Sequence, residues 1–323
     1  MERSVLTKWL LLFTLLIAGF SSTALALNLT VYSASGFVNS YLVSLARHDV
    51  DAALATPGVA RSSTISTALL TPAALGDLTG IHLVSDTDNG GGTHTVVFGY
   101  SFGATTGKTA FTVQRAGSRL GVFSAWRFVE SPLSVVEVTP LHDDAFAANG
   151  MHLVAAHGQN APTDYLVLVP TYVQLDHRST YLVAEKTKVL VNKPASTVAA
   201  RIDIQANPSF VKQVQKELNT SLASCVTQRV LLPTGCPMGK QISDRIQDAP
   251  QWAMVSYPRV TIVPGTNTDT WVVPTTTGRA HLTVRVKSIF DGSLSTFDED
   301  VPFTVGYTVT FQPGGSLLIT ANY

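Results

Sequence analysis

The chain has 323 residues, of which 45% are hydrophobic and only 14% are charged, whereas roughly 25% are charged in typical soluble proteins. Lys plus Arg and Asp plus Glu number 22 each, so the formal net charge is zero. Because no basic run is present to neutralise phosphates, nucleic acid is not an expected partner. The length suits two or three domains, and the wealth of Thr, Ser, Val and Leu favours a β-rich fold.

The N-terminal segment, residues 1–27, has the pattern of a leader. Arg3 and Lys8 form a short positive flank, and the apolar run Trp9–Phe20 follows it. Small residues come next, which completes the charged, apolar, small order of a secretory signal.

Two alanines at the end of this segment make it a candidate for cleavage. Ala24 and Ala26 occupy the two positions that a signal peptidase reads, so the pattern predicts a cleaved signal. Continued through Leu29, the apolar stretch approaches the ~20 residues that cross a bilayer, so an uncleaved membrane anchor is the main alternative. A buried core helix is a third. In both main cases the rest of the chain lies outside the cytoplasm, either secreted or anchored to the cell membrane.

Residues 34–131 are expected to form an α+β unit. Apolar residues from Phe37 to Leu45 recur at helical spacing, with Ser35 as the predicted N-cap, and a second short helix ends before Pro57. Another short helical piece is expected at 72–75. The strands that follow are expected at 81–85, 93–100, 109–114 and 120–128. Helices followed by an antiparallel meander are typical of a helix packed on a curved sheet.

Residues 133–194 contain no strong helix signal. Short apolar segments separated by polar turns predict a small all-β module here. The expected strands are 135–138, 151–155, 165–169 and 181–191.

Residues 195–323 begin with a strand, 198–204, and then a helix. Asn207 is a predicted N-cap, because Pro208 follows it at the first helical position. The helix is expected to run to about Cys225 with one apolar face, made by Val211, Val214, Leu218, Leu222 and Cys225. Strands are then expected at 252–263, 270–273, 279–290, 303–311 and 316–321. This section therefore repeats the element order of the first.

Cys225 and Cys236 are the two cysteines of the chain. In an oxidising compartment such a close pair predicts a disulfide, closing a loop worth roughly 3 kcal/mol by chain entropy. Two free buried thiols or a redox pair are the alternatives, although redox chemistry favours Cys-x-x-Cys spacing. No metal is expected on this pair, because zinc prefers four ligands and no histidine lies near.

Three motifs resemble catalytic or phosphate-binding patterns without their context. Ser101 stands in a Gly-x-Ser-x-Gly sequence, and Lys108 and Thr109 end an incomplete P-loop, but a strand rather than a helix is expected after both. Ser209 and Lys212 match Ser-x-x-Lys, without the motifs that accompany it in penicillin-binding proteins. We predict no catalytic residue and no cofactor.

Other polar and aromatic residues also favour structural roles. The Asp86-Thr-Asp-Asn sequence opens like a calcium loop, but Val97 stands where an EF-hand has glutamate. Four histidines of the middle section lack the His-x-x-x-His spacing of a helical metal site, so no metal is predicted. They are His142, His152, His157 and His177. The tryptophans predicted in strands, with a core role or alternatively a sugar-stacking one, are Trp126, Trp252 and Trp271.

Two segments resemble a known group of proteins. The sequences FSAWRFVESPL, Phe123–Leu133, and CVTQRVLLPTGCP, Cys225–Pro237, are similar to those of uncharacterised actinobacterial envelope proteins. The helix-then-meander units resemble the NTF2-like or cystatin-like cone. The overall plan is similar to TcaA-type envelope proteins of Gram-positive bacteria, which place small β modules and an NTF2-like domain outside a membrane helix. The resemblance implies no catalytic residues.

We therefore expect an α+β protein in which two NTF2-like or cystatin-like units flank a small all-β module. The expected function is a non-enzymatic binding, scaffold or sensing module of the cell envelope. Its expected partners are envelope proteins or wall polymer, with the membrane reached through the N-terminal segment. The alternative is an extracytoplasmic hydrolase with its pocket in an NTF2-like cone, which ionisable lining residues would favour.

Overall fold

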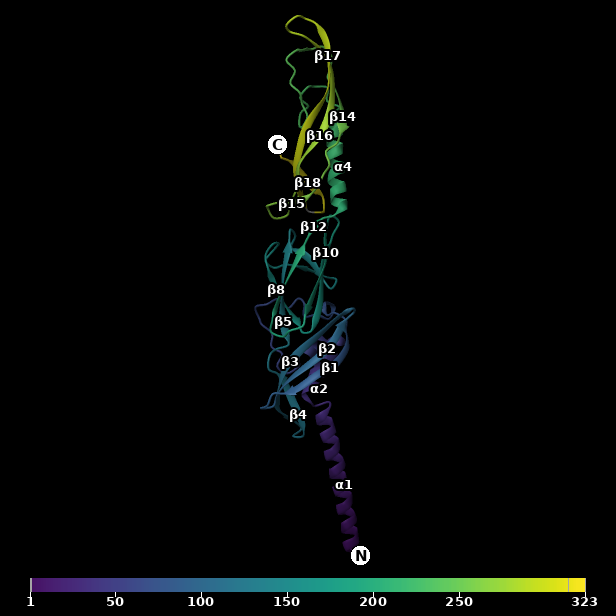
Figure 1. The fold of residues 1–323 in the computed structure, drawn as a ribbon, viewed down its shortest axis with the longest axis vertical. Helices are drawn as coiled ribbons and strands as arrows, with labels where there is room; N and C mark the ends of the chain where they lie inside the picture. Colours follow the sequence, from purple (N-terminus) through teal and green to yellow (C-terminus); the bar gives the residue numbers. More distant parts are fainter. Residues whose placement is uncertain (1, 313, 323) are drawn as a thin grey trace. The chain divides into compact units, whose positions relative to one another are not determined.

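The computed structural model describes residues 2–312 and 314–322. Within them the chain has four α-helices and a series of strands, paired mainly antiparallel in four sheets (Figure 1). The expected α+β class is confirmed.

The chain divides into two compact units, which are described separately. The first comprises the residues up to 139 together with 145–176 and 186–202. The second comprises 140–144, 177–185 and the residues from 203 onward. The section expected to be a small β module therefore contributes residues to both units.

Helix α1, Glu2–Leu29, opens the first unit. Its segment Lys8–Leu29 is long and apolar enough to cross a membrane, and almost all of its side chains are exposed. A soluble core helix would bury these side chains, so the third alternative for the leader does not describe this helix.

Helix α2, Ala34–Ala46, begins one residue before its predicted cap, Ser35. Ser33 is the N-cap, because its backbone is extended and its hydroxyl accepts a hydrogen bond from the Gly36 N–H at 2.9 Å. Ser35 lies inside the helix, so the predicted cap was wrong. Helix α3, Val50–Leu54, is capped in the same way by Asp49. A short 3₁₀ turn, Pro72–Ala74, confirms the expected helical piece.

A four-stranded meander follows in the order β1-β2-β3-β4. Its buried face packs against α2 around Tyr41, Phe111 and Phe128. The last strand starts later than expected, because Leu120 and Gly121 form its turn with positive φ angles of 52° and 71°. The strands are β1 Leu78–Asp88, β2 Thr93–Phe102, β3 Thr105–Arg119 and β4 Phe123–Phe128.

The next eight strands form two sheets, in the orders β12-β10-β9-β6-β7 and β11-β5-β8. Three of them, β6, β9 and the two-residue β12, had no counterpart among the expected strands. Their bounds are β5 Leu133–Leu141, β6 Ala145–Ala148, β7 Met151–Val154, β8 Thr163–Leu168, β9 Thr171–Arg178, β10 Leu182–Val191, β11 Thr197–Asp203 and β12 Gln205–Ala206.

Helix α4, Pro208–Cys225, confirms the predicted helix start and end. The Asn207 side chain accepts a hydrogen bond from the Phe210 N–H at 3.0 Å. Phe210 is fully buried and Val211 only half-buried, so Phe210 takes the first place on the inner face. The expected assignment of Val211 to that face is corrected accordingly.

The last sheet is built on a hairpin of two 18-residue strands, β16 and β17. The two strands expected at 270–273 and 279–290 are one continuous strand. A bulge places Pro274 and Thr275 opposite Gly306, so the proline, which cannot donate a hydrogen bond, interrupts the pairing without ending the strand. The strands are β13 Arg245–Ile246, β14 Gln251–Ser256, β15 Val263–Pro264, β16 Thr270–Lys287, β17 Leu294–Phe311 and β18 Leu317–Ala321.

Candidate functional site

The last turn of α1 is hydrogen-bonded to the edge of the first sheet. The Asn28 side-chain amide donates to the carbonyl oxygen of Val122 at 2.9 Å, and its oxygen accepts from the Ser124 N–H at 2.8 Å. One primary amide therefore pairs with the start of β4 and the residue before it, as a neighbouring strand would. The bonds join residues 94 and 96 positions apart. The end of α1 is thus an integral part of the first unit.

Two aromatic side chains secure the turn between α1 and α2. The ring of Tyr32 stacks on that of Phe123, with 4.4 Å between the ring centroids. The carbonyl oxygen of Tyr32 accepts a hydrogen bond from the indole nitrogen of Trp126 at 2.9 Å. Since Phe123 and Trp126 both lie on β4, the whole turn is held against one strand.

A glycine makes this turn compact. A Cβ atom at Gly36 would collide with the backbone carbonyl oxygens of Thr30 and Val31. The first turn of α2 therefore approaches the end of α1 more closely than any side chain allows. Gly36 fixes how α2 follows α1.

An open groove of about 690 Å³ lies beside this junction. Its walls come from the α1–α2 turn, from α2 and α3, and from β4. The lining includes the ring of Trp126, the guanidinium of Arg119 and several neutral polar side chains, but none of its residues is acidic. The neutral polar members include Asn39, Ser40, Thr56 and Ser124. Such a lining suits a polar or anionic group, because it combines the positive charge of Arg119 with hydroxyl and amide hydrogen-bond donors.

The predicted cleavage residues lie within α1. Ala24 is buried, with 7% of its surface exposed, and Ala26 is exposed. The carbonyl oxygen of Ala24 also accepts a hydrogen bond from the Asn28 amide at 3.1 Å. Cleavage after Ala26 would therefore remove one of the partners of Asn28.

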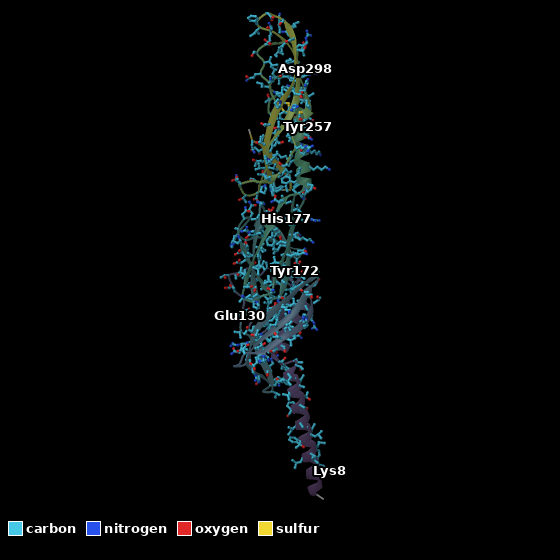
Figure 2. All side chains as sticks on the ribbon, viewed as in Figure 1. Lys8, Glu130, Tyr172, His177, Tyr257 and Asp298 are labelled. Atoms are coloured by element: carbon cyan, nitrogen blue, oxygen red, sulfur yellow. A yellow bond between two sulfur atoms is a disulfide. The ribbon has the colours of Figure 1, made fainter. Side chains whose placement is uncertain are left out.

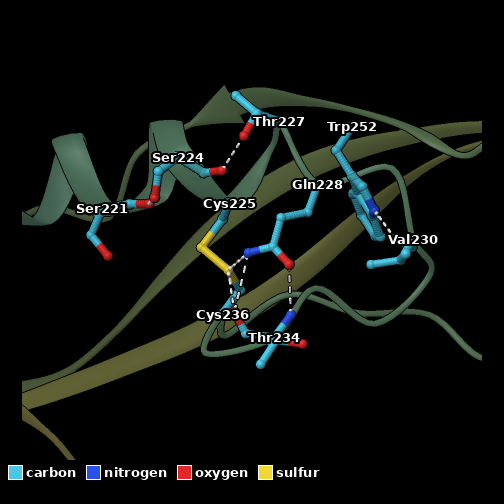
Figure 3. Close-up of a disulfide and its surroundings, with 9 residues drawn as sticks. All are labelled: Ser221, Ser224, Cys225, Thr227, Gln228, Val230, Thr234, Cys236 and Trp252. Atoms are coloured by element: carbon cyan, nitrogen blue, oxygen red, sulfur yellow. Dashed lines mark hydrogen bonds between the residues drawn. A yellow bond between two sulfur atoms is a disulfide. The ribbon is translucent and has the colours of Figure 1, made fainter.

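The structure joins Cys225 and Cys236 through their sulfur atoms, with 5.9 Å between the Cα atoms (Figure 3). Neither cysteine is left free as a thiol. The Gln228 side chain adds a second closure of this loop, because it bonds both the N–H and the carbonyl oxygen of Thr234. The indole of Trp252 donates to Val230 at 2.8 Å and fixes the loop on the second unit. The disulfide and these hydrogen bonds together hold the loop after α4 in place, which is a structural role.

The candidate catalytic motifs are not brought into working geometry. Ser101 lies in β2 opposite Thr106 of β3, so a hairpin stands where a nucleophile elbow or P-loop needs a helix. Ser209 and Lys212 lie in the first turns of α4, where Phe210 is buried in the core. All three motifs therefore belong to ordinary secondary structure, a β-hairpin in two cases and the start of a helix in the third.

The polar tip of the first hairpin is closed by its own hydrogen bonds. Asp86 bonds the Nδ1 atom of His94 at 2.7 Å, Asp88 accepts from Gly90 N–H, and Asn89 donates to Thr95. Across residues 2–312 and 314–322, no group of three or more His, Cys, Asp or Glu side chains is placed to hold a metal ion. The four candidate histidines are divided between the units, since His152 and His157 belong to the first, and His142 and His177 to the second.

The three candidate tryptophans have different surroundings. Trp271 and Trp252 are buried in the second unit, with 1% and 7% of their surfaces exposed, as expected for core residues. Trp126 is half-buried and lines the groove at the end of α1.

A charged cluster on the final hairpin was not anticipated from the sequence. The two ring nitrogens of His281 lie 2.8 Å from carboxylate oxygens of Asp300 and Asp298. These bonds raise the pKa of His281 above its ordinary value, and a hydrogen bond from Thr283 lowers the pKa of Asp298. With both nitrogens engaged, this imidazole is poorly placed to act as a base or a ligand. Cross-strand spacing is the signal that would have found it.

A second groove, of about 530 Å³, lies in the second unit between α4 and strands β17 and β18. Its lining combines apolar residues of α4 and β18 with polar residues of α4. Glu217 is its single carboxylate and accepts a hydrogen bond from Gln213 at 3.0 Å. It therefore lacks the paired carboxylates of a glycoside hydrolase.

The best-defined candidate site is thus the C-terminal end of the apolar helix α1, which hydrogen bonds and ring stacking join to the α+β part of the first unit. No family model, curated protein or solved structure matches this chain. The functional argument consequently rests on the geometry of the chain itself.

Proposed function

We propose that this chain is an extracytoplasmic cell-envelope protein that α1 anchors in the membrane, and that its α+β units serve as a non-enzymatic binding or scaffold module. The observation that carries the proposal is that α1 continues without a break through the predicted cleavage position, where Ala24 is buried and its carbonyl oxygen accepts a hydrogen bond from Asn28. A leader destined for removal has no need of a place in the folded unit. An anchor does, because it must transmit the position of the membrane to the domain.

The length of α1 supports an anchor. The apolar segment Lys8–Leu29 has 22 residues and, at about 1.5 Å per residue, measures roughly 33 Å. The hydrocarbon core of a bilayer is about 30 Å thick. Trp9 stands at one end of the segment and Tyr32 just beyond the other, which matches the enrichment of aromatic residues at membrane interfaces.

Charge supports the direction of insertion. Lys8, near the N-terminal end of α1 (Figure 2), follows Arg3 in the sequence, and the next cationic residue is Arg47. Positive residues remain on the cytoplasmic side of a membrane helix. The N-terminus is therefore cytoplasmic in this proposal, and both units are outside, where the Cys225–Cys236 disulfide is stable.

Packing supports a non-enzymatic role. The space between α2 and the first sheet, where an NTF2-like cone would hold its pocket, is filled by Tyr41, Phe111, Phe128 and other apolar side chains. In each unit a helix lies against an antiparallel sheet, which agrees with NTF2-like or cystatin-like units on a TcaA-type plan. Within this proposal the partners are neighbouring envelope proteins or wall polymer. A hydrolase would need ionisable groups in that space.

The intact mass of the protein from its own envelope tests this proposal. We expect the full N-terminal segment to be retained and the protein to stay with membranes after alkaline extraction. Recovery of a soluble form that lacks residues 1–26 would overturn the anchor. Binding of the detergent-solubilised full chain to purified wall polymer tests the binding role, and release of soluble wall fragments would instead establish the hydrolase.

A further inference from the structure

Contacts between the α1–α2 segment and β4 fix the direction in which the β3–β4 hairpin points. Residues nearer the N-terminus of the helical segment contact residues nearer the start of β4, so the two segments run in the same direction. The contacts are Phe37 with Phe128 (ring centroids 5.0 Å apart), Tyr32 with Phe123 (4.4 Å) and Asn28 with Val122 (2.9 Å). The hairpin therefore continues alongside α1 and away from the core of the unit.

The tip of this hairpin, Arg119–Val122, consequently lies level with the turn of α1 that precedes Asn28. That turn contains Ala24, which is buried although the residues around it in α1 are exposed. Figure 1 shows the end of the hairpin next to the last turns of α1. The tip thus stands beside the apolar segment, within two turns of its end at Leu29.

The tip presents apolar side chains to its surroundings. Leu120 is 91% exposed and Val122 is 40% exposed. Leu120 also adopts a positive φ of 52°, in the turn between Arg119 and Phe123, where glycine and asparagine are the ordinary choices for such a conformation. Solubility and turn geometry both argue for a polar residue at this position. A leucine there suits a non-aqueous environment better than an aqueous one.

The charge of the hairpin is of one sign. Residues 105–128 contain four cations and no acidic residue. Arg115, Arg119 and Arg127 are exposed along β3 and β4, and Arg119 belongs to the tip. An apolar tip with cationic flanks is complementary to a membrane surface that carries anionic phospholipids.

We propose that the β3–β4 tip inserts into the outer face of the same bilayer that α1 crosses. Leu120 and Val122 enter the boundary between headgroups and acyl chains, and Arg119 binds lipid phosphate. This inference rests on the proposed retention of α1 as an anchor, and it gives the first unit a second point of attachment to the membrane. Two attachments fix the orientation of that unit, which a single helix would leave free to rotate.

The test uses the full chain in vesicles. Because both native cysteines are joined in the disulfide, Leu120→Cys can be labelled selectively with a polarity-sensitive fluorophore. Phe290→Cys is the matched control, since Phe290 is a 97% exposed apolar residue at the tip of the β16–β17 hairpin. The vesicles contain phosphatidylcholine and phosphatidylglycerol, with a spin label on the acyl chain near the headgroup.

We expect several-fold stronger quenching of the label at position 120 than at position 290, together with a blue shift of its emission. Equal quenching at both positions, in protein that floats with the vesicles, would overturn the inserted tip and leave the anchor intact. Protein that fails to float with the vesicles would overturn the anchor, and with it this inference.

The lipid phosphate contact has a separate readout. We expect quenching at position 120 to fall when phosphatidylglycerol is omitted, and Arg119→Gln in the labelled protein to remove most of that dependence. Lys186→Gln is the control, because Lys186 is an exposed cation on a different strand. Quenching that is indifferent to phosphatidylglycerol would overturn the role of Arg119.

Discussion

The hydroxyl group of Tyr41 donates a hydrogen bond to the carbonyl oxygen of Val169 at 2.9 Å. Tyr41 is 1% exposed, and its burial raises the pKa of the phenol well above its ordinary value. The bond joins α2 to a segment 128 residues further along the chain, which follows β8. A single phenol therefore connects the helix of the first unit to a distant strand end.

We expect Tyr41→Phe to destabilise the first unit by about 1–3 kcal/mol, because a buried carbonyl loses its donor while the ring remains in place. Urea denaturation followed by circular dichroism measures this change. Tyr257→Phe is the control, since Tyr257 is 42% exposed, and it should change stability by less than about 0.5 kcal/mol. Equal stabilities of the two variants would contradict the structural importance of the Tyr41 bond.

The sequence predicted best where local chemistry decides the structure. Asn207 and Pro208 mark the start of α4 unambiguously, and Cys225 ends its apolar stripe. At the start of α2, however, the prediction named Ser35, whereas the cap is Ser33. Only the backbone conformation, extended at Ser33 and already helical at Ser35, decides between them.

The sequence-based prediction missed or divided strands whose extent depends on hydrogen bonding to a distant partner strand. In β9 the residues Thr171, Val173, Leu175 and His177 alternate inward, but a threonine and a histidine weaken the apolar signal. The strands predicted at 270–273 and 279–290 are one strand, β16, whose bulge at Pro274 and Thr275 leaves the pairing with β17 intact on either side. The Asn28–Val122 bond joins residues 94 apart, so no local pattern could have predicted it.

Asn28→Ala should loosen the junction between α1 and the first unit. The Ser124 N–H loses its acceptor and the Val122 carbonyl loses its donor, so we expect faster hydrogen exchange of the Ser124 amide and a loss of about 1–2 kcal/mol. Asn39→Ala is the control, because Asn39 is exposed on α2. Unchanged exchange at Ser124 in Asn28→Ala would refute the bond.

Gly36→Ala tests the compact turn between α1 and α2. The new Cβ atom meets backbone carbonyl oxygens, which cannot move aside as a side chain can, so we expect a loss of about 1–3 kcal/mol in the first unit. Gly19→Ala adds the same methyl group where no atom lies within 4 Å. Thermal unfolding of both variants in detergent should show a lower midpoint for Gly36→Ala alone. Equal midpoints would show that the turn has room to adjust.

Removal of the disulfide should destabilise the second unit. We expect the double variant Cys225→Ser, Cys236→Ser to lose roughly 3 kcal/mol, since the loop regains its freedom in the unfolded state. Chemical denaturation with and without reductant measures the effect, and reductant should lower the stability of the native chain but not that of the variant. A native chain indifferent to reductant would argue against a stabilising bond. Gln228, which bonds Thr234 on both sides, should keep the loop partly ordered in the variant.

His281 gives the final hairpin a dependence on pH. Its pKa is raised first by the hydrogen bond to Asp300 and then by that to Asp298, so the imidazolium persists above the ordinary value of about 6.5. A group whose pKa is raised in the folded state contributes fully below its ordinary pKa. That contribution is lost as the pH rises through the raised value. The pairing of β16 with β17 should therefore be firmer on the acidic side of neutrality.

Asp300→Asn tests this assignment, because the amide keeps the shape of the carboxylate without its charge. We expect the pKa of His281, followed by the chemical shift of its ring protons, to fall toward the ordinary value in this variant. Asp269→Asn is the control, since it removes the same charge 12 residues before His281, roughly 40 Å along an extended strand. If Asp300→Asn leaves the titration unchanged, the carboxylate does not hold the imidazolium. If Asp269→Asn lowers the pKa equally, the net charge of the hairpin, rather than the pairing across the strands, controls the titration.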